Sequence, residues 1–233
     1  MLRYTIATGK SETDILSEYG VRVSGTTGLV GKPEFKDRRK YSWPHLHGEW
    51  VDLRRRRLKA REITLKCWLK GENKQDAIAR MNAFMKAFET DSLIRLRVEF
   101  LNTTMIGSNN SLFYLVYLKG CDEPRYKWRT GKQIFQFEIH LKEPSPVKRI
   151  YQLDATDIGN VTLACDTPNE LDVFWGDGDV NYDVVGDNVT IGHKYSTAGR
   201  HYLIVCGVID EISSLTLTPS TQEITITQLY EEI

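Results

Sequence analysis

Two stretches of alternating apolar and polar residues constrain the fold of this chain more than any other feature. Apolar side chains occupy every second position from Ile63 to Leu69, and again from Phe135 to Leu141. A period of two places alternate side chains on one face of an extended strand. We therefore expect long, half-buried β-strands at residues 60–70 and 132–141.

One segment has helical periodicity instead. Residues 74–89 place apolar side chains at spacings of three and four, and Asn73 precedes them as a suitable N-cap residue. This pattern predicts a helix. The rest of the first half predicts strands at residues 15–24, 93–100 and 112–119, and a polar loop at residues 121–131.

Charge divides the chain into two parts of opposite sign, although its formal net charge is zero. Residues 1–149 contain 29 Lys and Arg against 17 Asp and Glu, whereas residues 150–233 contain 2 against 14. The change coincides with Glu143-Pro144-Ser145-Pro146, where two close prolines interrupt a strand and stiffen the connection. We therefore predict two domains, 1–149 and 150–233, which face different partners or attract each other's neighbours in an assembly.

The part after the prolines has the pattern of a β-sandwich. Its segments are short and strand-like, and turn residues recur at intervals of about 8–12 residues. A length of about 80 residues suits one immunoglobulin-like (Ig-like) domain. The predicted fold class is mainly β with one main α-helix: an N-terminal split β-barrel-like α+β domain followed by an Ig-like β-sandwich.

Residues 34–58 lack clean periodicity, and we interpret them as a long loop or β-arm. The segment is polar, aromatic and basic, and connections of this length are usually functional or disordered. We expect its aromatic, histidine and arginine side chains to contact other copies or partners. These residues are Trp43, His45, His47, Trp50, Arg54, Arg55, Arg56 and Arg57.

Two features of this arm have a second interpretation. His45 and His47 would share one face of a strand, as metal ligands do, but the sequence indicates no third ligand, and we favour two exposed polar residues. The run Arg54–Arg57 would suit nucleic-acid phosphates. Aromatic residues for base stacking are missing inside the run, so we favour an interfacial or solvated charge cluster and expect no nucleic-acid partner.

Sequence motifs of the common enzyme classes are missing. The chain has no GxSxG, HExxH or GxxxxGK[ST] pattern, and no GxGxxG pattern after a strand. We therefore expect a protein that is not an enzyme, with no catalytic residues, no cofactor and no metal. Its longest apolar runs span only a few residues, so we expect no membrane partner.

Two further expectations concern the cellular compartment. The first residues lack a basic region followed by an apolar one, which predicts synthesis in the cytoplasm without a secretory signal. The cysteines form no CxxC pair, and we favour reduced, buried thiols at Cys67, Cys121, Cys165 and Cys206. A Cys165–Cys206 bridge across the sandwich is the alternative.

A set of short motifs in the second half resembles the PKD family. A strand runs into Gly-Asp-Gly, a His-x-Tyr follows, and Gly-x-x-Tyr starts the next strand. The Asp side chains of the turn would cap backbone amides, which we favour, or bind calcium. The resemblance implies a seven-stranded sandwich for binding or spacing. The residues that carry it are Trp175, Gly176, Asp177, Gly178, His193, Tyr195, Gly199 and Tyr202.

The order of elements in the first half resembles the distal-tail protein family of long-tailed phages. A Gly-Val-x-Val strand comes first, then a polar arm, an Arg-x-Ile-Thr-Leu strand, a helix and three closing strands. The segments that carry the likeness are Tyr19–Val23, Arg61–Cys67, residues 74–89 and Phe135–Pro144.

These two resemblances together imply a structural protein of a phage or prophage tail, or of a tail-like particle. It would form a ring, expected to be hexameric, at the distal tail or baseplate of the virion, between the tail tube and the tail-tip or baseplate proteins. The PKD-like domain would be an appendage that contacts a receptor or glycan. The alternative is a PKD-containing surface module that binds glycan or protein ligands.

Overall fold

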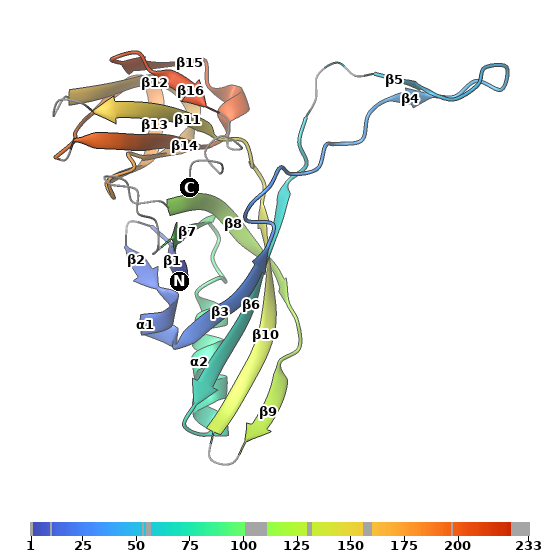
Figure 1. Ribbon diagram of the computed structural model, residues 1–233, viewed down its shortest axis with the longest axis vertical. Helices are drawn as coiled ribbons and strands as arrows, with labels where there is room; N and C mark the ends of the chain where they lie inside the picture. Colours follow the sequence, from blue (N-terminus) through green and yellow to red (C-terminus); the bar gives the residue numbers. More distant parts are fainter. Residues whose placement is uncertain are drawn as a thin grey trace.

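The computed structural model describes residues 2–9, 11–52, 54, 57–100, 111–129, 132–155, 160–196 and 198–224. These residues form mainly β-strands, arranged in two large sheets and one small hairpin (Figure 1). Within them, neither large sheet closes into a barrel. The predicted fold class, a β-rich α+β domain followed by a sandwich, is confirmed.

The first sheet has the strand order β2-β1-β7-β8-β10-β6-β3, and β9 adds to β10. Its longest antiparallel pair joins the two alternating stretches, with Leu65 opposite Ile139 and Leu69 opposite Phe135. All four side chains are buried, so the predicted strands and their buried faces are confirmed. The strands are β1 (Leu2–Ala7), β2 (Glu12–Asp14), β3 (Val21–Thr27), β6 (Arg61–Gly71), β7 (Ile94–Phe100), β8 (Ser111–Cys121), β9 (Arg125–Arg129) and β10 (Lys132–Glu143).

The predicted helix packs against this sheet. α2 (Lys74–Lys86) begins after Asn73, whose side-chain oxygen accepts a hydrogen bond from the Asp76 amide at 2.8 Å. Phe84 is buried, and its ring centroid lies 6.0 Å from that of Phe137 on β10. The helix is confirmed, although it ends at its thirteenth residue, earlier than expected.

Residues 15–24 do not form the single strand that we predicted. α1 (Ile15–Tyr19) comes first, and β3 follows it. The Asp14 carboxylate accepts hydrogen bonds from the amides of Leu16 and Ser17, and Gly20 ends the helix at a φ of 67°. These two caps favour a short helix over the strand pattern, which starts only at Val21.

The predicted loop at residues 121–131 is also wrong in part. It contains β9, which forms a hairpin with β10 and pairs Tyr126 with Phe135. β9 pairs with the part of β10 that lies beyond β8, on the same edge of that strand. Residues 130 and 131 of the predicted loop lie outside the described residues.

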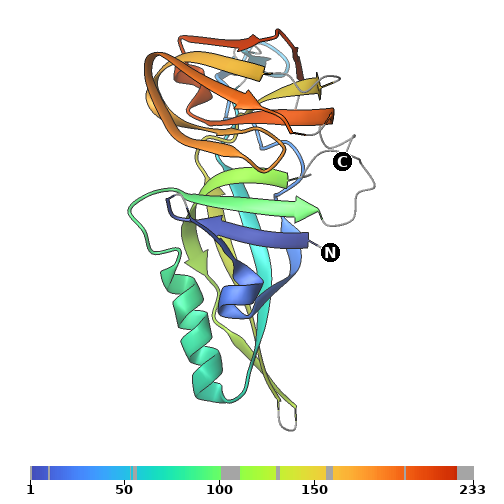
Figure 2. The ribbon, with the colours of Figure 1, turned by 90° about the vertical axis from the view of Figure 1, so that its left-hand side faces the viewer.

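The second sheet folds over itself into a sandwich (Figure 2). Its long strand β12 changes register between Cys165 and Val173. The first half of β12 pairs with β15, and the second half pairs with β14, so the hairpin β12–β13 contributes to both layers. The elements are β11 (Arg149–Ala155), β12 (Asn160–Phe174), β13 (Val180–Lys194), β14 (Gly199–Gly207), a 3-10 turn (Ile209–Glu211), β15 (Ser214–Thr218) and β16 (Gln222–Ile224).

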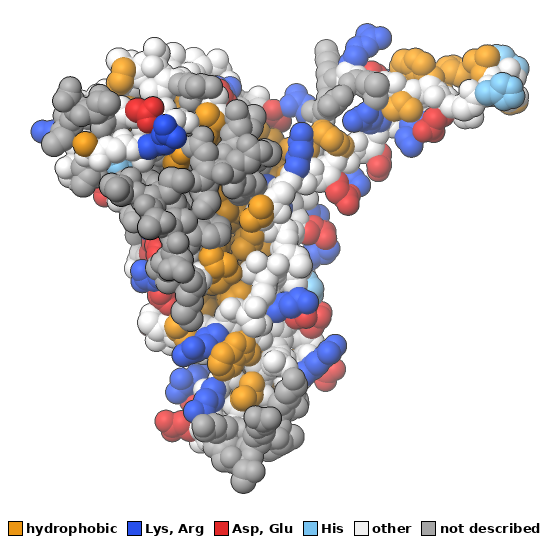
Figure 3. Space-filling view, in the orientation of Figure 1, with side chains coloured by type: hydrophobic (Ala, Val, Ile, Leu, Met, Phe, Trp, Pro, Cys, Tyr) orange, Lys and Arg blue, Asp and Glu red, His pale blue; other side chains and the backbone are white. Residues whose placement is uncertain are grey.

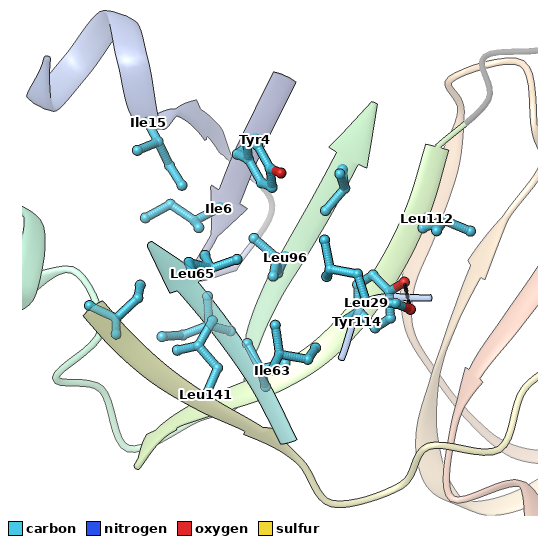
Figure 4. Packing of buried hydrophobic residues seen from close by; sticks show 14 of the residues in the cluster. Tyr4, Ile6, Ile15, Leu29, Ile63, Leu65, Leu96, Leu112, Tyr114 and Leu141 are labelled. Atoms are coloured by element: carbon cyan, nitrogen blue, oxygen red, sulfur yellow. Dashed lines mark hydrogen bonds between the residues drawn. The ribbon is translucent and has the colours of Figure 1, made fainter. Parts of the chain in front are cut away.

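The two sheets share one hydrophobic core at their junction. Phe113 of β8 stacks on Phe174 of β12 with ring centroids 3.5 Å apart. Tyr202 and Ile204 of β14 belong to the same buried cluster as the core of the first sheet. Figure 4 shows part of this cluster, from Ile15 of α1 across the first sheet to Leu112 of β8. The predicted division after residue 149 therefore falls beside a packed interface, and it stays a prediction.

Candidate assembly surface

A two-stranded arm leaves the body between β3 and β6 (Figure 1). At its base, Phe35 pairs with Leu58. Further out, β4 (Lys40–Tyr41) pairs with β5 (Trp50–Val51). The arm is a hairpin of its own and shares no sheet with the body within the described residues.

Three aromatic side chains lie together on the arm, and we call them the arm aromatic cluster: Tyr41, Trp43 and Trp50. The ring of Tyr41 stacks on Trp43 at 5.9 Å and tilts against Trp50 at 5.6 Å. Their side chains stay 42% to 48% exposed. Figure 3 shows apolar side chains along this projecting arm, where they would suit a contact with another molecule.

The tip of the arm carries the two predicted histidines. His45 and His47 are exposed on either side of Leu46, which is 57% exposed. Figure 3 shows them at the far end of the arm. In the described part of the chain, neither histidine belongs to a group of three possible metal-binding side chains.

The two described residues of the arginine run, Arg54 and Arg57, line one cavity but differ in their contacts. Arg54 is exposed, whereas Arg57 forms an ion pair of 2.6 Å with Asp210 of the acidic half. Arg55 and Arg56 lie outside the described residues. Arg57, at one end of the run, therefore forms a contact between the arm and the acidic half.

A second contact between oppositely charged halves lies at the junction of the two sheets. Arg95 of β7 donates two hydrogen bonds to Asp172 of β12, at 2.6 and 3.0 Å, and one to Asp183 at 2.6 Å. Its guanidinium also lies over the ring of Tyr182, whose hydroxyl donates to Glu12. Burial and Glu12 raise the pKa of Tyr182 to about 12. The charge division thus acts within the chain, which sequence alone did not reveal.

Three buried charges lie where the chain leaves the first sheet. Glu143, the last residue of β10, accepts a hydrogen bond from Arg61 Nε at 3.0 Å and another from Lys148. All three side chains are at most 3% exposed. The segment that we expected to be a linker is therefore fixed at both ends.

The same arginine ties a neighbouring loop to the junction. Arg61 Nη1 donates to the backbone oxygens of Gly28, Leu29 and Gly31 at 2.9 to 3.2 Å. Tyr114 also donates to the Leu29 oxygen, a bond drawn dashed in Figure 4. This loop leads into the arm, so these hydrogen bonds hold the segment that precedes the arm.

The PKD-like motif residues meet at one end of the sandwich. Trp175 is buried, and its indole donates to Asn181 at 2.6 Å. Its backbone oxygen accepts a hydrogen bond from the Tyr195 hydroxyl at 2.8 Å. Burial raises the pKa of that hydroxyl, which therefore stays protonated at neutral pH. Gly176 to Gly178 lie in the turn after β12. His193 lies near the end of β13 and Tyr195 directly follows that strand, whereas Gly199 and Tyr202 lie on β14.

The turn itself requires glycine. Gly176 has a φ of 88°, and a Cβ there would lie 2.6 Å from the Tyr202 backbone oxygen. The neighbouring Asp177 Oδ1 accepts the Asp179 amide at 3.1 Å, which is the amide-capping interaction that we favoured over calcium.

Replacing Gly176 with alanine is expected to destabilise the protein by about 2–4 kcal/mol, because positive φ and a backbone overlap both oppose the methyl group. Gly192→Ala is the matched control in the same sandwich, since a Cβ there meets nothing within 4 Å. Denaturant unfolding of both variants measures the difference. Equal losses in the two variants would contradict the role of the turn.

One arrangement resembles a catalytic triad. His140 Nδ1 lies 3.1 Å from Thr64 Oγ1, and His140 Nε2 lies 3.0 Å from Asp122 Oδ1. Thr64 and His140 are directly opposed on neighbouring strands, so ordinary sheet register accounts for their contact. None of the cavities described for this chain is lined by these three residues. The expectation that the chain is not an enzyme stays a prediction.

The cysteines are free thiols, so the alternative bridge between Cys165 and Cys206 is not formed. Cys121 is exposed, contrary to expectation, whereas the others are buried. Burial raises the pKa of Cys67 and of Cys206 to about 12. Such thiols stay protonated at neutral pH and are poor nucleophiles.

Of the helices in the described residues, none is both long and apolar enough to span a bilayer.

Sequence reasoning found Trp43, Trp50 and the two histidines of the arm but missed Tyr41. The sequence did contain a pattern that indicates Tyr41, because this residue lies two positions before Trp43 and would share a strand face with it. The junction residues Arg95 and Asp172 carried no such signal, since their pairing depends on how the two sheets dock.

The similarities of this chain to known proteins are similarities to solved structures. No protein-family model matches it, and no curated protein matches its sequence. SPP1 Dit (gp 19.1), described as a paradigm of hub adsorption apparatus in Gram-positive infecting phages, is 12% identical, with a TM-score of 0.43 over 95% of this chain and 84% of that chain. A chain of the phage p2 baseplate in its activated conformation with Sr is 8% identical, with a TM-score of 0.45 over 89% of this chain and 98% of that chain. The corresponding baseplate with Ca gives the same values.

Proposed function

We propose that this chain is a structural component of a phage tail or tail-like particle, where it forms a ring with copies of itself. The observation that carries the proposal is the arm aromatic cluster. Three large aromatic side chains project from the body and remain nearly half exposed. Exposure of this kind favours burial against another molecule. The element order that resembles distal-tail proteins supports the tail as its location.

A second surface of the body is suited to receive a neighbour. Within the described residues, β3 pairs only with β6, so its other edge is open. A cavity of about 410 Å³ lies along this edge and is lined partly by Leu2, Ile15 and Val21. An open edge beside apolar side chains favours strand addition.

The separation of these two surfaces favours a ring. An arm that binds a different surface of the next copy makes a heterologous contact, and such contacts close into rings when the rotation permits. We propose six copies, as the resemblance implies, placed between the tail tube and the tip or baseplate proteins.

In this proposal the second domain is a PKD-like appendage fixed rigidly to the ring. Arg95, Phe113 and Phe174 at the junction support a rigid attachment. The alternative, a glycan-binding module, needs an exposed aromatic platform. Two of the sandwich's aromatic residues, Tyr195 and Tyr202, are buried, which speaks against that alternative.

The mass of the purified chain tests the proposal. The monomer is 26.8 kDa, and we expect a discrete species near six times that mass in a concentration series followed by mass photometry. Negative-stain images of that species should show closed rings. A chain that stays monomeric throughout the series, or that forms only a two-fold dimer, would contradict the ring.

A further inference from the structure

A separate constellation lies at the turn between β12 and β13, far along the chain from the arm. Asp177, Asp179 and His193 each offer a ligand atom, and these atoms lie within 4.8 Å of one another. In the described part of the chain, this is the only group of three such residues. It includes a histidine, so it differs from the exposed acidic groups that are common on protein surfaces.

The imidazole of His193 is held in one orientation. Its ring stacks on Trp175 with centroids 4.8 Å apart, and it meets Tyr195 edge-on at 4.7 Å. Its side chain is 9% exposed. Nε2 lies 2.7 Å from Asp177 Oδ2, while the other oxygen of Asp177 accepts the Asp179 amide. One ring nitrogen is thus occupied by a carboxylate that is itself fixed.

The other ring nitrogen has no such partner. Among the described residues, His193 Nδ1 makes no hydrogen bond, and its charged neighbour is Asp179 Oδ2 at 3.8 Å. That separation is too long for a hydrogen bond. It matches two ligands of one cation, because metal bonds of about 2.0–2.2 Å place neighbouring ligand atoms about 3–4 Å apart.

We propose that His193 Nδ1 and the Asp179 carboxylate bind a divalent transition-metal ion, with Asp177 orienting the imidazole. Histidines that bind metals usually donate their other ring N–H to a carboxylate, as His193 can do to Asp177. One nitrogen and one carboxylate ligand suit Zn²⁺, Co²⁺ or Ni²⁺. Asp179 is 77% exposed, so the ion enters from solvent and water completes its coordination.

The proposed ion competes with a proton for Nδ1. Binding requires a neutral imidazole, so affinity should fall as pH falls. Without the ion, the same residues form a His–Asp pair that only caps the turn. The two interpretations, a metal site and a turn cap alone, differ in whether added metal binds at Nδ1.

The test is a Zn²⁺ titration of the full chain labelled with ¹⁵N, followed by long-range imidazole ¹H–¹⁵N spectra. His45 and His47 are first replaced by glutamine, so that the arm histidines cannot bind the metal. We expect a saturable shift of His193 Nδ1, with Nε2 keeping its proton. Calorimetry with Co²⁺ should give one ion per chain.

Asp179→Asn is the decisive variant. It removes the proposed ligand but keeps the backbone bond from Trp175 N to Asp179 O, so the turn is retained. We expect at least a tenfold loss of affinity. Asp187→Asn is the matched control on the same strand pair, where Asp187 is exposed, and it should leave affinity unchanged. Absence of a saturable shift at Nδ1, or equal affinity in both variants, would overturn the site.

Discussion

Replacing Glu143 with alanine is expected to lower the free energy of unfolding by about 3–5 kcal/mol, the cost of breaking a buried ion pair. Glu143 lies between Arg61 and Lys148, and all three side chains are at most 3% exposed. Its removal leaves two buried positive charges without their carboxylate. Denaturant unfolding, followed by intrinsic fluorescence, measures the loss.

Glu138→Ala is the matched control for this prediction. Glu138 lies on the same strand, is 39% exposed, and faces Lys66 at 3.9 Å. Exposed pairs of this kind contribute at most about 1 kcal/mol. If Glu143→Ala costs no more than Glu138→Ala, the buried charges do not hold the junction.

Replacing the whole arm aromatic cluster with serine is expected to abolish ring formation. Tyr41, Trp43 and Trp50 pack on one another and lie outside both hydrophobic cores. The variant should therefore keep the unfolding free energy of the parent within about 1 kcal/mol, as for other exposed positions. Mass photometry should show monomers where the parent chain forms the larger species.

A second triple variant separates this effect from a general loss of apolar surface. Leu93, Tyr117 and Val185 are 38% to 45% exposed and lie away from the arm. Their replacement by serine should leave assembly unchanged. Equal loss of assembly in the two triple variants would mean that the arm has no special role.

The strands that sequence predicted best are those that bury one face. Alternation located β6 and β10 because the opposed residues Leu65 and Ile139 both face the core. Helical spacing located α2 for the same reason, since Phe84 had to face the sheet. A local sequence pattern is enough to predict a strand or helix when one side of that element is buried and the other is exposed.

Other elements depend on information that local pattern does not carry. α1 forms because Asp14 and Gly20 cap it, in a segment too short to show helical periodicity. β9 is a strand because β8 covers only the second half of β10 and leaves the first half of that edge free for pairing. Glu143 looked like the start of a linker, although one of its buried partners, Arg61, lies far from it in sequence.

The candidate surfaces show the same limit. The arm was evident from composition, because aromatic residues such as Trp43 and Trp50 stood in a segment without periodicity. The pairing of Arg95 with Asp172 could not be foreseen, since it requires the docking of two sheets. Charge counts gave the sign of each half, and only the fold shows that some of the opposite charges meet within one chain.

Cross-linking between differently labelled copies tests most directly whether the arm binds another molecule of the same chain. A photoreactive residue placed at Leu46, near the tip of the arm, is activated in an equal mixture of ¹⁴N and ¹⁵N protein. We expect mass spectrometry to find mixed-isotope cross-links from the arm to the open edge near β3 of another copy. Cross-links that join only peptides of the same isotope, or an arm that links to no other copy, would contradict the account.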